Sequence, residues 1–226
     1  MPSPDSSRLH LWWRVRDYAT ALRLQATWPV APGSYEHPAR RVGPPVVLVP
    51  GVWEPWWFLR PLAELLFTHG VAVHVVPALG YNRRPVADAA RVLGRYVVGR
   101  ELRDVVLVAH SKGGLIGKLA MLRHDPDGRI ASMVAVNAPF SGSALARWVP
   151  LRSVRAFVPS DATIVALAAE LEVNARITSA HAFWDPHAPA GSSLDGAEDV
   201  VLSTPGHFRP LADPELASLL LARLVG

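Results

Sequence analysis

The sequence predicts an α/β protein in which a mostly parallel sheet carries helices on both faces. The runs 46–49 and 105–109 are short and wholly apolar, as expected for strands that are buried on both sides. Segments with helical periodicity, such as 84–100 and 210–225, alternate with these runs. This alternation is typical of right-handed βαβ units, and 226 residues suit one such domain.

Composition excludes several classes of function. The chain has no cysteine, which rules out disulfides, thiolate metal sites and a cysteine nucleophile. The net charge is +4, and almost all of the positive charge comes from scattered arginines without a nucleic-acid motif, so we expect a solvated basic surface and no nucleic-acid partner. No His-Glu-x-x-His run is present, and we expect neither a metal nor a cofactor.

An N-terminal helix is predicted over residues 9–28. One stripe of it holds Leu11, Val15, Tyr18, Leu22 and Ala26. Two interpretations stay open: the helix packs on the following domain, or it is a basic amphipathic helix that lies on a membrane surface with Trp12, Trp13 and Trp28 at the interface. Residues 29–45 hold five prolines and two glycines and form a linker. We therefore divide the chain into an N-terminal helix with linker, 1–44, and a main domain, 45–226.

No membrane-spanning segment or signal peptide is expected. No apolar run reaches about 18 residues. Near the start of the chain Arg14, Arg16, Asp17 and Arg23 interrupt the apolar core that a signal peptide requires. We expect a cytoplasmic protein, membrane-associated if the N-terminal helix binds lipid.

Aromatic residues follow the first strand of the domain. Pro50-Gly51-Val52-Trp53 ends the strand, a helix with Pro55 in its first turn comes next, and a second strand is predicted over 71–76. Aromatic side chains so close to a strand end suggest an apolar substrate pocket, the alternative being ordinary core and surface positions. The candidate pocket residues are Trp53, Trp56, Trp57, Phe140 and Trp148.

A sharp strand-to-helix turn is predicted around Ser111. The strand 105–109 precedes it, and Gly113 and Gly114 begin a helical pattern behind it. Such a turn strains its central residue and needs small neighbours, here Ala109 and Gly113. The turn raises the serine oxygen above the carboxyl edge of the sheet and points the Lys112 N–H to where an oxyanion would form. We expect His110 to pack within the turn and the Lys112 side chain to reach solvent.

The pentapeptide Ala109-His110-Ser111-Lys112-Gly113 resembles the nucleophile elbow of the α/β-hydrolase superfamily, with Ala where Gly is usual. The alternative is a turn that merely contains a serine. The resemblance covers roughly residues 45–226. This part of the chain is similar to small bacterial serine esterases and lipases that lack the first strands of the full fold. It implies that the loop after the first strand gives a second oxyanion N–H, from Val52 or else Trp53, with Pro50 where a His would stand.

The second half of the domain continues the alternation. A strand is predicted over 130–136, and residues 143–174 form either a cap over the site or a simple crossover, with a helix capped by Ser160 or Asp161. Strands over 177–184 and 200–203 then lead into Asp185 and His207.

Ser111, Asp185 and His207 follow the chain order of the α/β-hydrolase triad, and each comes just after a predicted strand. Among the carboxylates between Ser111 and His207, only Asp185 lies at the carboxyl end of a strand, and Asp195 is the second candidate. The hypothesis is a serine carboxylester hydrolase, an esterase or lipase acting through an acyl-enzyme on esters with an apolar acyl group. An acyltransferase or thioesterase with the same triad and a non-catalytic binding protein of this fold are the alternatives.

Overall fold

A six-stranded, entirely parallel sheet lies at the centre of the protein. The computed structural model describes residues 4–27, 30–148, 157–189 and 191–226. The strands run in the order β2-β1-β3-β4-β5-β6, so the chain starts next to one edge, completes that edge with β2 and then adds β3 to β6 in turn toward the other edge. The predicted α/β class is confirmed. The strands are β1 Val46–Val49, β2 Val73–Val75, β3 Val105–His110, β4 Ile130–Val136, β5 Ile177–Ala182 and β6 Glu198–Leu202.

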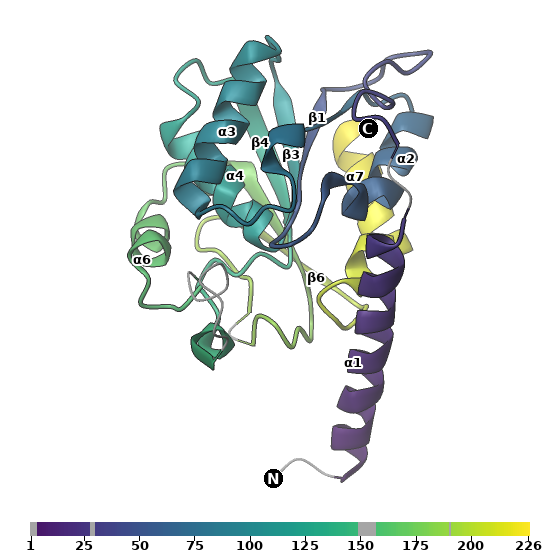
Figure 1. Ribbon diagram of the computed structural model, residues 1–226, viewed down its shortest axis with the longest axis vertical. Helices are drawn as coiled ribbons and strands as arrows, with labels where there is room; N and C mark the ends of the chain where they lie inside the picture. Colours follow the sequence, from purple (N-terminus) through teal and green to yellow (C-terminus); the bar gives the residue numbers. More distant parts are fainter. Residues whose placement is uncertain (1–3, 28–29, 149–156, 190) are drawn as a thin grey trace.

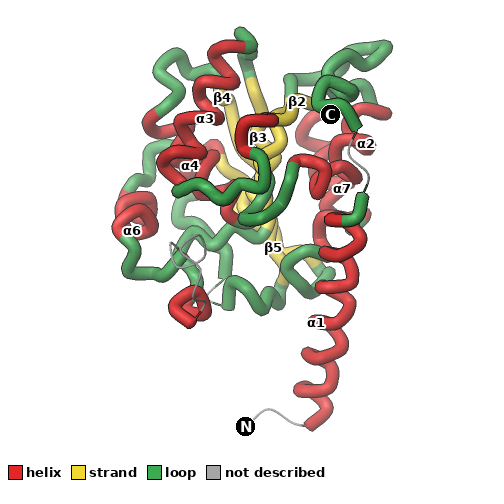
Figure 2. Tube along the Cα trace, viewed as in Figure 1, coloured by secondary structure: helices red, strands yellow, loops and turns green. Residues whose placement is uncertain are grey.

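Helices cover both faces of the sheet. Figures 1 and 2 show α3, α4 and α6 on one side and α1, α2 and α7 on the other. Short 3₁₀ turns join several elements: η1 Trp56–Leu59, η2 Pro77–Leu79, η3 Ala144–Trp148, η4 Asn174–Arg176 and η5 Arg209–Ala212. The α-helices are α1 Pro4–Gln25, α2 Arg60–Thr68, α3 Val86–Gly99, α4 Lys112–Arg123, α6 Ala162–Ala169 and α7 Pro214–Leu224.

Successive residues of β1 belong to two separate hydrophobic cores. Val47 and Val49 of β1 belong to the core under α3, α4 and α6, whereas Val46 and Leu48 belong to the core under α2 and α7. All four are buried. This explains why the strand carries no polar residue: alternate side chains point to opposite faces, and both faces are covered.

Several element boundaries differ from the sequence prediction. The strand predicted over 71–76 is limited to Val73–Val75, and β5 ends at Ala182, two residues earlier than expected. The helix predicted over 84–100 begins only at Val86. Pro85 precedes it in an extended conformation, and a proline disfavours helical backbone angles in the residue before it. The last strand begins at Glu198, because that residue pairs with Thr178 of β5.

The N-terminal helix packs on the body through an unexpected face. Leu24 is buried in the core beneath α2 and α7, and Asp17 is fully buried. Trp13 packs against Phe183 and Trp184. The predicted stripe lies on the opposite side and is open to solvent at Leu11, Val15, Tyr18 and Leu22, and Ala26 is also exposed. Trp28 lies outside the described residues. None of the described helices is both long and apolar enough to span a membrane.

The segment between β4 and β5 contains α6, which lies against the α4 side of the sheet (Figure 1). The Asp161 side chain caps it by accepting a hydrogen bond from the Thr163 N–H at 2.9 Å, as one of the two predicted capping residues. Ile164 and Leu167 are buried in the core beneath it. Residues 149–156 of the predicted insertion lie outside the described part of the chain.

Candidate active site

Ser111 occupies a strained turn between β3 and α4. Its φ of 52° and ψ of −121° are rare for a residue other than glycine. The turn is held by the Ser111 N–H, which donates to the carbonyl oxygen of Val136 at 2.8 Å. A Cβ at Gly113 would lie 2.1 Å from the carbonyl oxygen of Val49, so only glycine permits α4 to approach β1 this closely.

His207 and Asp185 form a buried pair near this serine. Asp185 follows β5 and His207 follows β6, and Asp185 Oδ2 lies 2.7 Å from His207 Nδ1. The other carboxylate oxygen, Oδ1, accepts hydrogen bonds from the N–H groups of His187 at 2.7 Å and Ala188 at 3.3 Å. These bonds fix the orientation of the carboxylate and leave Oδ2 to hold the imidazole.

The pKa values of this pair are shifted in opposite directions. Burial alone would raise the pKa of Asp185, but the neighbouring His207 outweighs it and lowers the pKa to about 2. Burial lowers the pKa of His207, whereas the carboxylates of Asp185, Glu54 and Asp17 raise it, and the net pKa lies above the ordinary 6.5. Asp185 is therefore ionised at neutral pH, and an imidazolium on His207 is stabilised.

A cavity of about 480 Å³ contains both Ser111 and His207 in its wall. Val52 and Trp53, from the loop after β1, line it as well. The remaining lining residues are Arg14 and Tyr18 of α1, Glu54, Pro139, Ser143, Ala146, Phe157, Pro186, His187 and Phe208. The wall is thus built from the loops at the carboxyl ends of the strands, together with α1 and the segment between β4 and α6.

Of the five aromatic residues predicted for a pocket, Trp53 alone lines this cavity. Trp56 is buried and packs edge-on against Tyr35 in the core beneath α2 and α7. Trp57 packs beside Trp56 and Tyr81. The reason is the 3₁₀ turn η1, which directs these side chains toward the helical layer.

The other two predicted pocket residues also lie apart from the cavity lining. Phe140 is buried in the core, where its ring lies close to Gly114. Trp148 is 74% exposed and has the Arg147 guanidinium 5.1 Å above its ring. The segment predicted as a cap still reaches the cavity, but through Ser143, Ala146 and Phe157.

A buried network behind Ser111 joins three loops. His110 Nδ1 lies 2.9 Å from the Glu54 carboxylate, and His110 Nε2 lies 3.0 Å from the carbonyl oxygen of His207. Glu54 also accepts a hydrogen bond from the Gly51 N–H at 2.6 Å. His110 therefore does more than pack in the turn: it links the loop after β1 to the loop that carries His207.

The backbone of His207 is held from two further directions. Asn137, at the end of β4, donates from Nδ2 to the His207 carbonyl oxygen at 2.8 Å. Asp17 of α1 accepts the His207 N–H at 2.9 Å through Oδ2, and the N–H groups of Phe208 and Arg209 at 2.8 and 3.0 Å through Oδ1. These contacts tie the loop to the sheet on one side and to α1 on the other.

Sequence reasoning did not identify Asp17, Glu54 or Asn137 as site residues. Glu54 follows the predicted oxyanion loop directly, and Asn137 follows a strand, so both carried a positional signal. Asp17 had a weaker signal, since it is a single acidic residue among the arginines of a helix that the sequence places far from His207.

His187 lies beside His207 and is neutral. The two rings stack with centroids 4.6 Å apart. Burial, followed by the charge of His207, lowers the pKa of His187 to about 3. It therefore adds no positive charge next to His207 at neutral pH.

The Lys112 side chain is buried, contrary to the prediction that it reaches solvent. Its Nζ donates to the carbonyl oxygen of Asn82 at 2.9 Å and also to that of Arg84. Burial lowers the pKa of Lys112 to about 8. The side chain thus fastens the loop before α3 to the start of α4.

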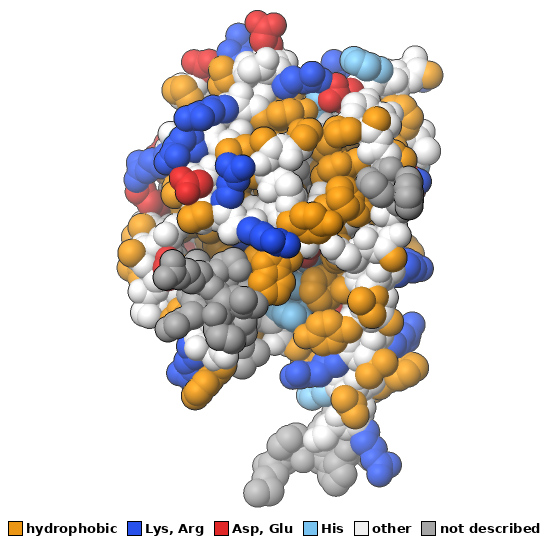
Figure 3. Space-filling view, viewed as in Figure 1, with side chains coloured by type: hydrophobic (Ala, Val, Ile, Leu, Met, Phe, Trp, Pro, Cys, Tyr) orange, Lys and Arg blue, Asp and Glu red, His pale blue; other side chains and the backbone are white. Residues whose placement is uncertain are grey.

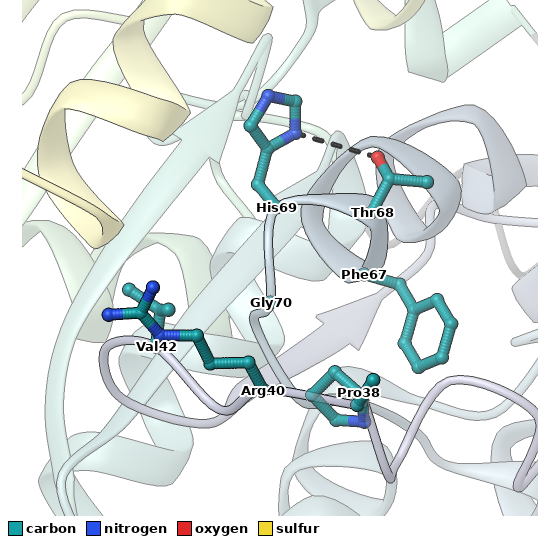
Figure 4. A pocket seen from close by; sticks show the side chains of 8 residues that line it. Pro38, Arg40, Val42, Phe67, Thr68, His69 and Gly70 are labelled. Atoms are coloured by element: carbon teal, nitrogen blue, oxygen red, sulfur yellow. Dashed lines mark hydrogen bonds between the residues drawn. The ribbon is translucent and has the colours of Figure 1, made fainter.

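A second cavity of about 470 Å³ lies between the linker and the end of α2 (Figure 4). Figure 4 shows Arg40 and Val42 on one side and Thr68 and His69 on the other. None of its eight lining residues carries a carboxylate. Across the described part of the chain, no group of three or more His, Asp or Glu side chains is placed to hold a metal ion. The Ser111 cavity is therefore the candidate active site.

Comparisons with known proteins agree with the architecture. A family model described as the alpha/beta hydrolase family matches residues 46–224. No curated protein sequence matches the chain significantly.

Many solved structures share the fold. The mature form of Bacillus licheniformis lipase BlEst2 superposes with a TM-score of 0.65 at 16% identity, over 86% of this chain and 96% of that one. A carboxylesterase structure from the thaumarchaeon Nitrososphaera gargenis gives a TM-score of 0.60 at 15% identity, over 83% and 91%. A structure from work on the metagenome-derived lipolytic enzymes LipS and LipT gives 0.59 at 18%, over 86% and 98%. At these identities the likeness establishes a shared fold.

Proposed function

The chain belongs to the alpha/beta hydrolase family, and on that premise we propose that it is a serine carboxylester hydrolase, an esterase or lipase, with Ser111 as nucleophile. The observation that carries the proposal is the cavity whose wall contains both the strained Ser111 and the Asp185-bound His207. A nucleophile, a base and a carboxylate that orients the base are the components of acyl transfer through a covalent intermediate.

Each proposed residue has a distinct task. His207 Nε2 takes the proton of the Ser111 hydroxyl while the serine oxygen attacks the ester carbonyl carbon, and the same nitrogen then protonates the departing alcohol. Water next attacks the acyl-enzyme, with His207 again as base, and releases the acid. Asp185 keeps the ring proton on Nδ1, so that Nε2 is free to accept, and it stabilises the imidazolium that forms.

Two backbone N–H groups are proposed to bind the oxyanion. Lys112 is the first residue of α4, so its N–H has no acceptor within the helix and carries the positive end of the helix dipole. Val52 lines the same cavity from the loop after β1. The bond from the Gly51 N–H to Glu54 keeps this loop in place, as a preorganised oxyanion site requires.

The substrate proposed is an uncharged ester with an apolar acyl group. The cavity wall includes Trp53, Phe157 and Phe208, with Ala146 and two prolines. A cavity of about 480 Å³ is in the range of small-molecule sites.

Ser111→Ala tests the proposal directly. Hydrolysis of p-nitrophenyl esters should fall by on the order of 10⁶, the loss found for the nucleophile of a comparable triad. Ser143→Ala is the matched control, because Ser143 lines the same cavity but its hydroxyl donates to the His187 carbonyl oxygen. Retention of a tenth of the wild-type rate by a folded Ser111→Ala protein would refute the assignment.

A further inference from the structure

The exposed face of α1 combines an apolar stripe with arginines. We name Leu11, Val15, Tyr18 and Leu22 the α1 stripe; their spacing of four, three and four residues places them on one side of the helix. Their exposed fractions are 63, 54, 49 and 71%, although the opposite side of the same helix is packed on the body. An aligned apolar row that stays open to solvent marks an interaction surface.

The charges beside the α1 stripe indicate what it binds. Arg8, Arg14, Arg16 and Arg23 are all exposed. Between residues 7 and 27 the sole acidic residue is Asp17, which is buried. Figure 3 shows blue basic side chains interspersed with orange apolar ones where α1 lies. Such a face attracts an anionic surface. It repels a second copy of itself because the other carboxylate of the helix, Asp5, lies at its start, and no exposed carboxylate between residues 7 and 27 opposes the arginines.

The α1 stripe is continuous with the candidate active site. Tyr18 belongs to the stripe and also lines the cavity that contains Ser111, and Arg14 lines the same cavity. We propose that α1 docks on anionic lipid surfaces through the stripe and its arginines, and thereby places the cavity mouth at the lipid. This inference rests on the proposed function, and it specifies that the substrate is an ester held at a lipid surface.

Vesicle co-sedimentation tests the docking surface with the full chain. Binding should be strong to vesicles of equal parts phosphatidylglycerol and phosphatidylcholine, weak to phosphatidylcholine alone, and reduced by salt. The charge-neutral pair Leu11→Gln/Leu22→Gln should weaken binding by about tenfold or more, as should Arg16→Gln/Arg23→Gln. The control pair Val165→Gln/Leu171→Gln removes comparably exposed apolar residues in and just after α6 and should leave binding unchanged.

Activity measurements separate this inference from the proposed function. The stripe pair should hydrolyse dissolved p-nitrophenyl butyrate at the wild-type rate but lose the wild-type preference for an ester embedded in vesicles. Normal hydrolysis with vesicle binding unaffected by the stripe variants would overturn the docking surface alone. A dimer in light scattering that the stripe pair dissociates would assign the stripe to a second copy instead. Vesicle binding without any Ser111-dependent hydrolysis would overturn the proposed function.

A different observation carries a second inference, about Asp17. Its carboxylate is fully buried and accepts three consecutive N–H groups of the loop that carries His207. Gly206 permits this approach, since a Cβ there would lie 2.4 Å from Asp17 Oδ1. We infer that Asp17 is a positioning residue for His207, so that α1 is part of the catalytic arrangement.

Asp17→Asn breaks one of the three contacts selectively. The amide oxygen can keep the Phe208 and Arg209 N–H groups at Oδ1, which places the amide NH₂ against the His207 N–H. We expect kcat on p-nitrophenyl butyrate to fall by on the order of 100-fold with KM nearly unchanged, because the base is misplaced and the substrate contacts remain. Asp161→Asn, which alters a helix cap far along the chain, is the control and should change neither value.

The pH profile distinguishes positioning from a general loss of structure. His207 is surrounded by Asp185, Glu54, His110 and His187 as well as Asp17. Removing the negative charge of Asp17 should therefore move the acidic limb of kcat to lower pH. Wild-type kcat and an unmoved limb would overturn the inference. In case the variant fails to fold, hydrogen exchange of the 207–209 amides in the wild type provides a separate check, and unprotected amides would equally overturn it.

Discussion

Asp185→Asn is the most informative single change at the candidate site. The two oxygens of Asp185 have different partners: Oδ1 accepts the N–H groups of His187 and Ala188, and Oδ2 lies 2.7 Å from His207 Nδ1. An asparagine would keep its oxygen at the Oδ1 position, since that site faces two donors. Its NH₂ would then face His207 Nδ1 and force the ring proton onto Nε2, where it prevents removal of the Ser111 proton.

The magnitude follows from these contacts. To restore the productive tautomer, the amide must flip and place its NH₂ against two buried N–H groups, at about 1–3 kcal/mol for each group left unsatisfied. The resulting total of about 2–6 kcal/mol corresponds to a turnover lowered by about 30-fold to 10⁴-fold. The upper end agrees with the loss of about 10⁴ known for a neutralised triad aspartate.

Steady-state hydrolysis of a p-nitrophenyl ester measures this effect, with circular dichroism to verify the fold. Asp195→Asn is the matched control. Asp195 is exposed, and the Asn174 side chain donates to its backbone carbonyl oxygen at 2.7 Å, which the substitution retains, so turnover should not change. A loss of less than about tenfold in a folded Asp185→Asn protein would refute the tautomer argument. Interchanged results for the two variants would refute the choice of carboxylate.

Three further predictions concern the buried charges. Activity should rise with pH through one ionisation above 6.5, because the base must be neutral. The pKa of His207 lies above that value because Asp185 and the other acidic neighbours raise it more than burial lowers it. A rate that stays flat between about pH 5 and 8 would contradict this prediction. Glu54→Ala should lower the free energy of unfolding in urea by about 2–6 kcal/mol, because two buried partners are left unsatisfied, whereas Glu54→Gln can still accept from Gly51 and donate to His110 and should cost much less. Lys118 is fully buried, its Nζ has no hydrogen-bond partner among the described residues, and burial lowers its pKa from 10.5 to about 8. Lys118→Met should therefore raise the free energy of unfolding at pH 7 by up to about 3 kcal/mol. The free energy of unfolding of the wild type should rise between about pH 8 and 10.5, where the unfolded chain binds more protons, and that rise should vanish in the variant.

Features that depend on a short stretch of chain could be predicted from the sequence. The apolar runs at 46–49 and 105–109 identify buried strands because no half-exposed strand would carry so few polar residues. Ser111 could be predicted as a candidate site residue because a strand, small residues and a helical pattern surround it within one turn. Asp185 and His207 could be predicted as candidate partners because parallel strands bring their carboxyl ends to one edge, so chain order alone predicts that loop residues meet there.

Only the tertiary structure decided which surfaces find partners. The periodicity of α1 correctly groups Leu11, Val15, Tyr18 and Leu22 on one side, yet the body packs against the other side, which holds Asp17. Likewise, sequence cannot tell that the Lys112 side chain turns inward to carbonyl oxygens 28 and 30 residues away. A helical repeat specifies which residues share a face, because that depends on 3.6 residues per turn. Whether that face is buried depends on the free energy of contacts with residues distant in the chain, such as the three N–H groups of the His207 loop, and these come together only when the sheet has formed.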